Sequence, residues 1–150
     1  MATSVSIEEF ANLVGHDLGT SAPLTVTQEQ VNLFADATGD HQWIHVDPER
    51  AKSGPFGGPI AHGYLTLSLI PTLMGSVLSV SGISMGVNYG CNKVRFTSPV
   101  PVGAELVAQA TVAAVDEVAG GLQVCLDVTV SVVGAPKPSC VAQVVYRYYR

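Results

Sequence analysis

An aspartate and a histidine lie five residues apart in the segment GDHQWIH, at positions 40 and 45. Together, Asp40 and His45 can hold one water molecule and move protons to and from it, because an imidazole and a carboxylate in an apolar site both titrate near neutral pH. Both residue types are also common in turns. Spacing alone therefore favours a turn residue and an ordinary surface histidine over a catalytic pair.

His62 and Gly63 stand at the start of an apolar segment and suggest a second chemical role. The first backbone N–H groups of a helix have no intrahelical partner and carry a partial positive charge. At a helix start, the Gly63 N–H can polarise a carbonyl or stabilise an enolate oxygen. A glycine here also lets a helix pack closely against its neighbour, and the two interpretations are compatible.

A metal site competes for the same residues. His41 and His45 have the i, i+4 spacing of two ligands on one helix, and Asp40 and His62 can complete such a site. However, His41 is followed by Gln42 and not by the glutamate of an H-E-x-x-H motif. A helix carrying both histidines would also begin directly after a glycine that ends another helix. We therefore expect no metal.

Helix signals on both sides position the Asp40–His45 segment. The T-x-x-Q capping box at 27–30 begins a helix that Gly39 should end. An Asp-Pro pair at 47–48 is typical of an N-cap followed by the first helical residue, and it begins another brief helix. Asp40 is thus expected just after one helix and His45 just before the next.

Residues 53–92 contain no Asp, Glu, Lys or Arg. Within this run, Ile60 to about Val80 is expected to form one apolar helix. A membrane-spanning helix needs about 20 predominantly apolar residues, but Pro71 and Gly75 interrupt this segment, so we expect no membrane span. A helix with little charge on any face is more simply one enclosed by the rest of the protein or by a second subunit.

The second half of the chain has the period of β-strands. Apolar residues occupy alternate positions in three runs, over 106–114, 122–132 and 140–148. A further strand is expected over 86–97, and turns at 119–121 and 134–138 join the runs as antiparallel neighbours. Such a sheet must bury its apolar face on another element. We predict a single α+β domain over 1–150, with a long curled antiparallel sheet wrapped around the central apolar helix at 60–80.

Composition narrows the function classes. Of 150 residues, 13% are charged and 47% hydrophobic, and the formal net charge is −5. The seven basic residues are scattered, so we expect no nucleic-acid partner. Three cysteines without C-x-x-C spacing predict neither a disulfide framework nor a zinc ribbon, and the first residues lack the basic start of a signal peptide. These features predict a cytoplasmic protein.

Three motifs follow one another along the chain: ATGDHQWIHVDP at 37–48, GPIAHGY at 58–64 and NYGCNKVRFTSPVPVG at 88–103. In this order they resemble the motifs of the MaoC-like (R)-specific enoyl-CoA hydratase family, also called hydratase 2. The resemblance covers roughly residues 20–148. It implies a hot-dog fold, which the alternating second half of the chain fits.

By this resemblance, Asp40 and His45 would bind the catalytic water and act as general base and acid, and the Gly63 N–H would polarise the thioester oxygen. The implied reaction is reversible syn addition of water to a trans-2-enoyl-CoA, giving the (R)-3-hydroxyacyl-CoA. Coenzyme A is part of this acyl-CoA substrate, so no separate cofactor is expected. Which of Asp40 and His45 makes each proton transfer stays open, because a coupled pair shares its titration.

The family usually has Asn-Pro where this chain has Gln42-Trp43. Gln42 keeps an amide on a longer side chain, and we expect it to position the substrate together with His62, while Trp43 alters the pocket wall. Lys93 and Arg95 are the first charges after the uncharged run and fall on the same side of a strand. We expect them to contact the CoA phosphates, but a role in discouraging edge pairing fits them equally well.

Two other functions stay open at this point. An acyl-CoA thioesterase shares the fold and the ligand, although thioesterases of this fold lack the ordered Gly-Asp-x-x-x-x-His and His-Gly set. A non-catalytic acyl-CoA-binding subunit of a two-protein dehydratase would keep the pair but lose the amide geometry at Gln42. We expect a hydratase that acts as a homodimer, because hot-dog subunits pair their sheets. The low charge fits apolar surface covered by a second subunit and an apolar acyl tunnel.

Overall fold

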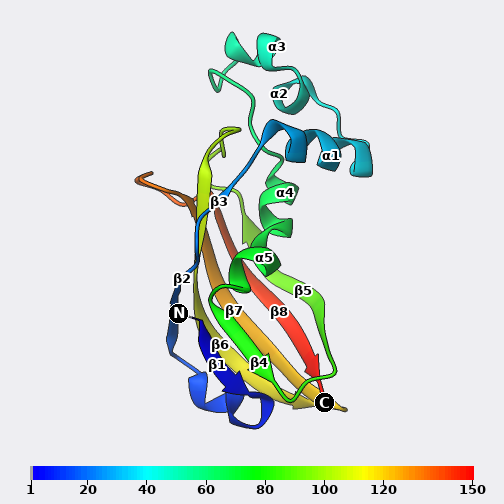
Figure 1. Cartoon of the computed structure of the whole chain (residues 1–150), viewed down its shortest axis with the longest axis vertical. Coiled ribbons are helices and arrows are strands. Elements are labelled where there is room, and N and C mark those ends of the chain that lie inside the picture. Colours follow the sequence, from blue (N-terminus) through cyan, green and yellow to red (C-terminus); the bar gives the residue numbers. More distant parts are fainter. Residues whose placement is uncertain (1) are drawn as a thin grey trace.

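A sheet with four long strands dominates the computed structural model, which describes residues 2–150 (Figure 1). The long strands are β5 (Met85–Arg95), β6 (Glu105–Val118), β7 (Gly121–Val132) and β8 (Cys140–Tyr149). Two short strands, β2 (Asp17–Thr20) and β3 (Leu24–Thr25), both pair with β6. The order across the sheet is β2-β6-β7-β8-β5, and all its pairings are antiparallel.

Alternation along the strands decides which face of the sheet is buried. In β7, Leu122, Val124, Leu126, Val128 and Val130 are buried, whereas the residues between them are partly or fully exposed. The register of β7 against β8 continues this pattern, because inward residues of one strand pair with inward residues of the other. The antiparallel strands expected from the sequence are confirmed.

The apolar helix expected at 60–80 is broken into α4 (Gly63–Ser68) and α5 (Ile70–Met74). The prediction of one continuous helix was wrong because Pro71 has no N–H and its ring clashes with the carbonyl four residues earlier. A new helix therefore starts around it, with Pro71 in the first turn of α5. Ile60, placed in the helix by the prediction, lies before it and forms an isolated bridge with Pro101.

The residues after α5 turn into β4 (Leu78–Ser81), whereas the sequence pattern predicts the end of the helix there. This strand pairs in parallel with β1 (Thr3–Ser6), a strand that was not expected. The 3-10 helix η1 (Ile7–Leu13) follows β1 and buries Ile7 and Phe10 at that end of the sheet. The amino-terminal segment therefore closes one end of the core.

The helices α4 and α5 lie across the inner face of the sheet (Figure 1). Their buried residues Leu65, Ile70, Leu73 and Met74 join one core cluster with the inward residues of the sheet. This is the predicted α+β arrangement, with two helices in place of one. Among residues 2–150, no helix has the length and apolar character that crossing a membrane requires.

A lobe of short helices lies beyond the amino-terminal end of α4 (Figure 1). It contains α1 (Gln28–Thr38), α2 (Trp43–Val46) and α3 (Pro48–Lys52). The predicted caps are present: Thr27 accepts from the Gln30 N–H at 3.1 Å, and Asp47 accepts from the Arg50 N–H at 3.1 Å. These caps fix the two ends of the segment that carries Asp40 and His45.

Candidate active site

Asp40 directly follows the end of α1. Gly39 ends that helix with a φ of 83°, a left-handed conformation that glycine adopts without strain. The Asp40 carboxylate then accepts from the Gln42 N–H at 3.4 Å, which closes a short turn before α2. His45 lies inside α2 and not in the irregular segment expected from the sequence. This helical turn brings His45 back toward Asp40.

His45 is 6% exposed and held in one tautomer. Its Nδ1 lies 2.7 Å from the Ile60 carbonyl oxygen, and because a carbonyl only accepts, Nδ1 carries the hydrogen. Nε2 of the neutral ring is then a free base. Burial lowers the pKa of His45, and the nearby His62 lowers it further. The hydrogen bond to the Ile60 carbonyl and the charge of Asp40 raise the pKa, but by less. His45 is therefore a neutral base at pH 7.

His62 is 2% exposed and connects the parts of the site. Its Nε2 donates to the backbone carbonyl of Asp40 at 2.9 Å, which anchors the turn after α1. Its ring stacks on His45 with 3.9 Å between ring centroids and packs against Phe34 on α1 at 4.8 Å. The buried Nδ1 of His62 has no hydrogen-bond partner among the described residues.

The side chains of Asp40, His45 and His62 converge: one polar atom from each lies within 4.8 Å of the others. Hydrogen bonds to water span about 2.7–3.2 Å, so a single water molecule can bridge the Asp40 carboxylate and an imidazole nitrogen. The carboxylate is exposed to solvent, whereas both imidazoles are buried. The arrangement can hold one water and exchange protons with it.

The same three residues are poorly arranged for a metal ion. The rings of His45 and His62 lie only 24° from parallel, so their in-plane lone pairs do not converge on one point as tetrahedral ligands must. The alternative pair of His41 and His45 does not form, because His41 Nε2 lies 2.9 Å from the Asp36 carboxylate instead.

Gly63 is the first residue of α4, so its N–H has no intrahelical acceptor. A Cβ at this position would lie 2.7 Å from the ring of Phe96, so only glycine fits without displacing that ring. Gly63 also lines a cavity of about 280 Å³ together with Phe56, Thr66, Phe96 and Ser139. A carbonyl oxygen entering this cavity can meet the free N–H.

Gln42 and Trp43 are neighbours in the sequence but contact different parts of the site. The exposed Gln42 is the N-cap residue of α2 and binds Asp40 through its backbone N–H. Trp43 faces α3: the Arg50 guanidinium lies 4.4 Å from its ring, and a Cβ on Gly54 would lie 2.9 Å from it. Trp43 therefore holds α2 against α3.

Lys93 and Arg95 are not brought to Asp40 and His45. Both residues line one depression on the outer face of the sheet, which also contains Asp127 and Gln143. This arrangement confirms that they share a side of β5, but it is the face opposite α4. Arg95 directly precedes Phe96, whose ring packs on Gly63, so the two side chains leave the strand on opposite faces.

Several groups of this site were not found from the sequence. The Ile60 carbonyl that orients His45 is a backbone atom and has no sequence signal. Gln28, the first residue of α1, donates to the His45 carbonyl at 2.8 Å, and the sequence around it signals only a helix start. Phe96 lies in a quoted motif, but its contact with Gly63 depends on long-range packing.

Comparison with known proteins decides the family. A family model described as "MaoC like domain" matches residues 9–134. The chain belongs to the MaoC-like dehydratase family. It is 50% identical over 149 residues to 3-hydroxyacyl-thioester dehydratase Z of Mycobacterium tuberculosis, covering 99% of both chains. It is also 50% identical over 109 residues to nodulation protein N of Rhizobium meliloti, covering 68% of this chain and 65% of the relative.

The MaoC-like fold is seen in solved structures. The (R)-hydratase from A. caviae superposes with a TM-score of 0.72 at 27% identity, covering 89% of this chain and 94% of that one. The expected hot-dog fold and the family resemblance are confirmed. Membership gives the chain a dehydratase or hydratase role, in the hydro-lyase class of enzymes.

Proposed function

We propose that this MaoC-like protein is an (R)-specific enoyl-CoA hydratase, which adds water reversibly to trans-2-enoyl-CoA. The observation that carries this proposal is the convergence of the Asp40 carboxylate and the neutral His45 within 4.8 Å, next to the His62-Gly63 helix start. Addition of water needs one group to remove a proton from water and one to deliver a proton to carbon. The Asp40–His45 pair supplies both on the same side of the bound substrate.

The addition of water needs no reactant besides water and the enoyl thioester. The oxygen of the water bonds to C3 of the enoyl chain as the pair accepts one of its protons. The C2–C3 double bond opens, its electrons pass to the thioester oxygen as an enolate, and the pair returns a proton to C2 as the enolate collapses. Because both transfers start from one pair, hydroxyl and hydrogen arrive on one face, which is syn addition. The two groups act as one coupled acid–base unit.

Gly63 stabilises the enolate in this proposal. Charge grows on the thioester oxygen only as C3 is attacked, so a fixed N–H aimed at that oxygen favours the transition state over the ground state. The Phe96 ring that packs on Gly63 makes this end of the cavity apolar, which strengthens the interaction. His62 positions the pair from behind, through the ring stack and the Asp40 carbonyl.

The CoA part of the substrate must leave this cavity to reach cations. Lys93 and Arg95 remain our candidates for the phosphates, with no cofactor beyond the substrate itself. Since Arg95 is adjacent to Phe96 but faces the other way, CoA has to pass around the edge of β5 to meet it. This path makes the two cations separable from the chemistry in an experiment.

We also propose that a second copy of the chain covers the edge strand β5. This strand is exposed along nearly its full length and carries Met85, Val87 and Tyr89 as exposed large hydrophobic residues. Residues 85–92 of this strand carry no charge, and a long uncharged stretch of edge strand invites pairing with another chain. A homodimer is the simplest closed form, and a monomeric mass in solution at micromolar concentration would contradict it.

The proposed reaction is tested with crotonyl-CoA. Wild-type protein should remove the enoyl absorbance and produce 3-hydroxybutyryl-CoA of the (R) configuration, identified by chiral chromatography. Release of free CoA without hydration would favour a thioesterase. Tight binding of the thioester with no turnover would favour the non-catalytic subunit. Formation of the (S) product would contradict the proposed stereochemistry.

A further inference from the structure

Two cavities follow each other along α4 and α5, beyond the Gly63 end of the site. The first has a volume of about 310 Å³ and begins at Leu67 and Ser68, one helical turn after Gly63. The second, of about 200 Å³, lies beside Met74 and Leu78. Pro71, Asn88 and Tyr146 line both cavities. We call these three residues the neck.

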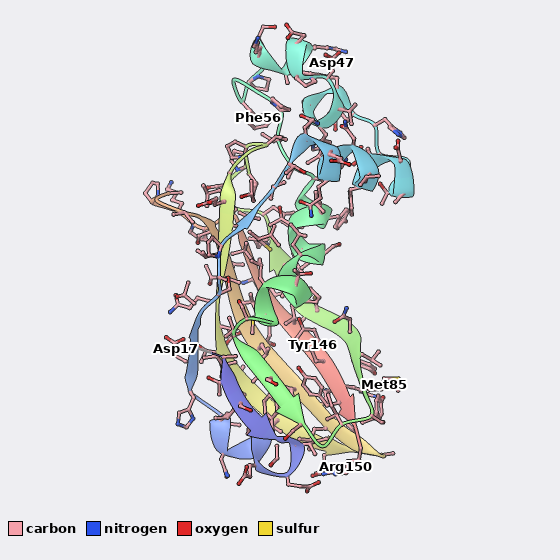
Figure 2. The ribbon with its side chains drawn as sticks, in the orientation of Figure 1. Asp17, Asp47, Phe56, Met85, Tyr146 and Arg150 are labelled. Atoms are coloured by element: carbon pink, nitrogen blue, oxygen red, sulfur yellow. The ribbon has the colours of Figure 1, made fainter. Side chains whose placement is uncertain are left out.

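The neck contains a buried hydroxyl that has no partner. Tyr146 is 9% exposed, and its Oη makes no hydrogen bond with any described residue. A buried donor without a partner is unfavourable, so such groups are normally satisfied by water or by a ligand. Burial raises the pKa of Tyr146, so the phenol keeps its proton. Figure 2 shows Tyr146 on β8 near α5.

Asn88 provides a second polar group at the same place. It pairs with Tyr146 across β5 and β8, so the two side chains leave the sheet on one face. Its amide offers both a donor and an acceptor. The other residues of the first cavity include Leu67, Ile70 and Val144. The neck thus adds the Asn88 amide and the Tyr146 hydroxyl to a cavity that apolar side chains also line.

We infer that the acyl chain of the preferred substrate carries a hydrogen-bond acceptor, a keto or hydroxyl oxygen, several carbons beyond the double bond. This inference rests on the proposed function, which places the thioester at Gly63. The chain then runs along α4 into the first cavity, and its oxygen accepts from the Tyr146 Oη beside the Asn88 amide. Pro71 follows Gly63 by eight residues, which is roughly 12 Å along one unbroken helix axis and less across the break between α4 and α5. A plain alkyl chain would leave the buried phenol without a partner.

The test compares two chains that differ by one carbonyl. Wild-type kcat/KM is measured for trans-2-octenoyl-CoA and for 7-oxo-trans-2-octenoyl-CoA. The oxo substrate should be preferred about tenfold, the discrimination expected from one buried neutral hydrogen bond. Tyr146→Phe keeps the ring and removes the hydroxyl, so the preference should disappear. Tyr149→Phe, a matched change on the outer face of the same strand, should keep it.

Each ratio is taken within one variant, which cancels any general loss of folded protein. Equal kcat/KM for the two substrates in wild type, or a preference that survives in Tyr146→Phe, would overturn the inference. If the protein hydrates neither octenoyl substrate nor crotonyl-CoA, the proposed function fails separately. Calorimetric Kd values for octanoyl-CoA and 7-oxooctanoyl-CoA then decide the question, with tighter binding of the oxo ligand in wild type but not in Tyr146→Phe as the expected result.

Discussion

The imidazoles of His45 and His62 stack with 3.9 Å between centroids, although His45 lies within α2 and His62 precedes α4, 17 residues apart in the sequence. Each ring donates to a backbone carbonyl, His45 to Ile60 and His62 to Asp40. The two rings therefore join the loop after α1 to the start of α4. A displacement of either ring moves both the acid–base pair and the Gly63 N–H.

This relationship predicts that His62 positions the site. His62→Ala removes the stack and the anchor of the Asp40 turn, and kcat for crotonyl-CoA should fall about 10- to 100-fold, because a misplaced general acid–base pair loses most of its contribution. The free energy of unfolding should fall by about 1–3 kcal/mol. His62→Phe keeps a stacked ring and should recover stability more than rate. Full activity of His62→Ala would show that the stack is dispensable.

The lowered pKa of His45 predicts how rate depends on pH. Hydration requires the neutral ring, so kcat/KM should be level near pH 7–8 and fall only when pH drops below the ordinary histidine value of 6.5. His45→Gln removes the group and should leave no such step in its residual activity. If the wild-type rate already falls while the pH is lowered toward 6.5, burial is not the dominant influence on the pKa of His45.

The free energy of unfolding should also depend on pH through His45. Between pH 6.5 and the lowered pKa, the unfolded chain binds a proton at His45 and the folded chain does not. The free energy of unfolding therefore decreases as pH falls through this window and levels off below it. Denaturant titrations of wild type and His45→Gln should differ in this slope. Identical slopes would mean that His45 has the same pKa in both states.

Packing at Gly63 predicts a separate defect. In Gly63→Ala, the new Cβ would lie 2.7 Å from the Phe96 ring, and one of the two groups has to move. Overpacking of this kind costs about 1–3 kcal/mol, and kcat should fall because the N–H leaves the thioester oxygen. Gly58→Ala is a matched control, since a Cβ there has open space and no positive φ. Equal rates for the two variants would remove Gly63 from the oxyanion site.

The CoA contacts can be tested apart from the chemistry. Replacement of Lys93 and Arg95 by Ala should raise KM for CoA esters several-fold and leave short pantetheine esters unaffected, since only CoA carries the phosphates. Arg150→Ala is the control: its guanidinium binds Glu8 and Glu117 at the opposite end of the molecule from α3 (Figure 2). An unchanged KM for the full CoA ester would exclude both residues from the site.

Local signals predicted much of the fold. The caps at Thr27 and Asp47, the stop at Gly39 and the strand alternation after residue 105 each act over a few residues, and the structure contains them. The 60–80 segment was predicted less well. Its apolar composition suits a buried strand as well as a helix, so pairing with β1 decides the state of Leu78–Ser81, and that pairing is long-range.

The candidate site was also predicted in part, for the same reason. Asp40, His45, His62 and Gly63 were found from residue types and motifs, and the structure brings their elements together. The contacts that tune them come from positions distant in sequence: the Ile60 carbonyl, the Phe96 ring and the Gln28 amide. Lys93 and Arg95 were correctly placed on one side of a strand, but period alone does not say which side faces the cavity.

The most direct measurement is kcat/KM for crotonyl-CoA in Asp40→Asn and His45→Gln. Asp40→Asn keeps the size of the side chain and an oxygen for the Gln42 N–H but removes the charge. Each variant should lose about 100- to 10,000-fold, and the double variant should lose little more, because residues that act as one unit are not additive. His41→Gln, a neighbouring exposed histidine bonded to Asp36, should keep the wild-type rate. Wild-type kcat/KM in Asp40→Asn would contradict an Asp40–His45 pair acting on water.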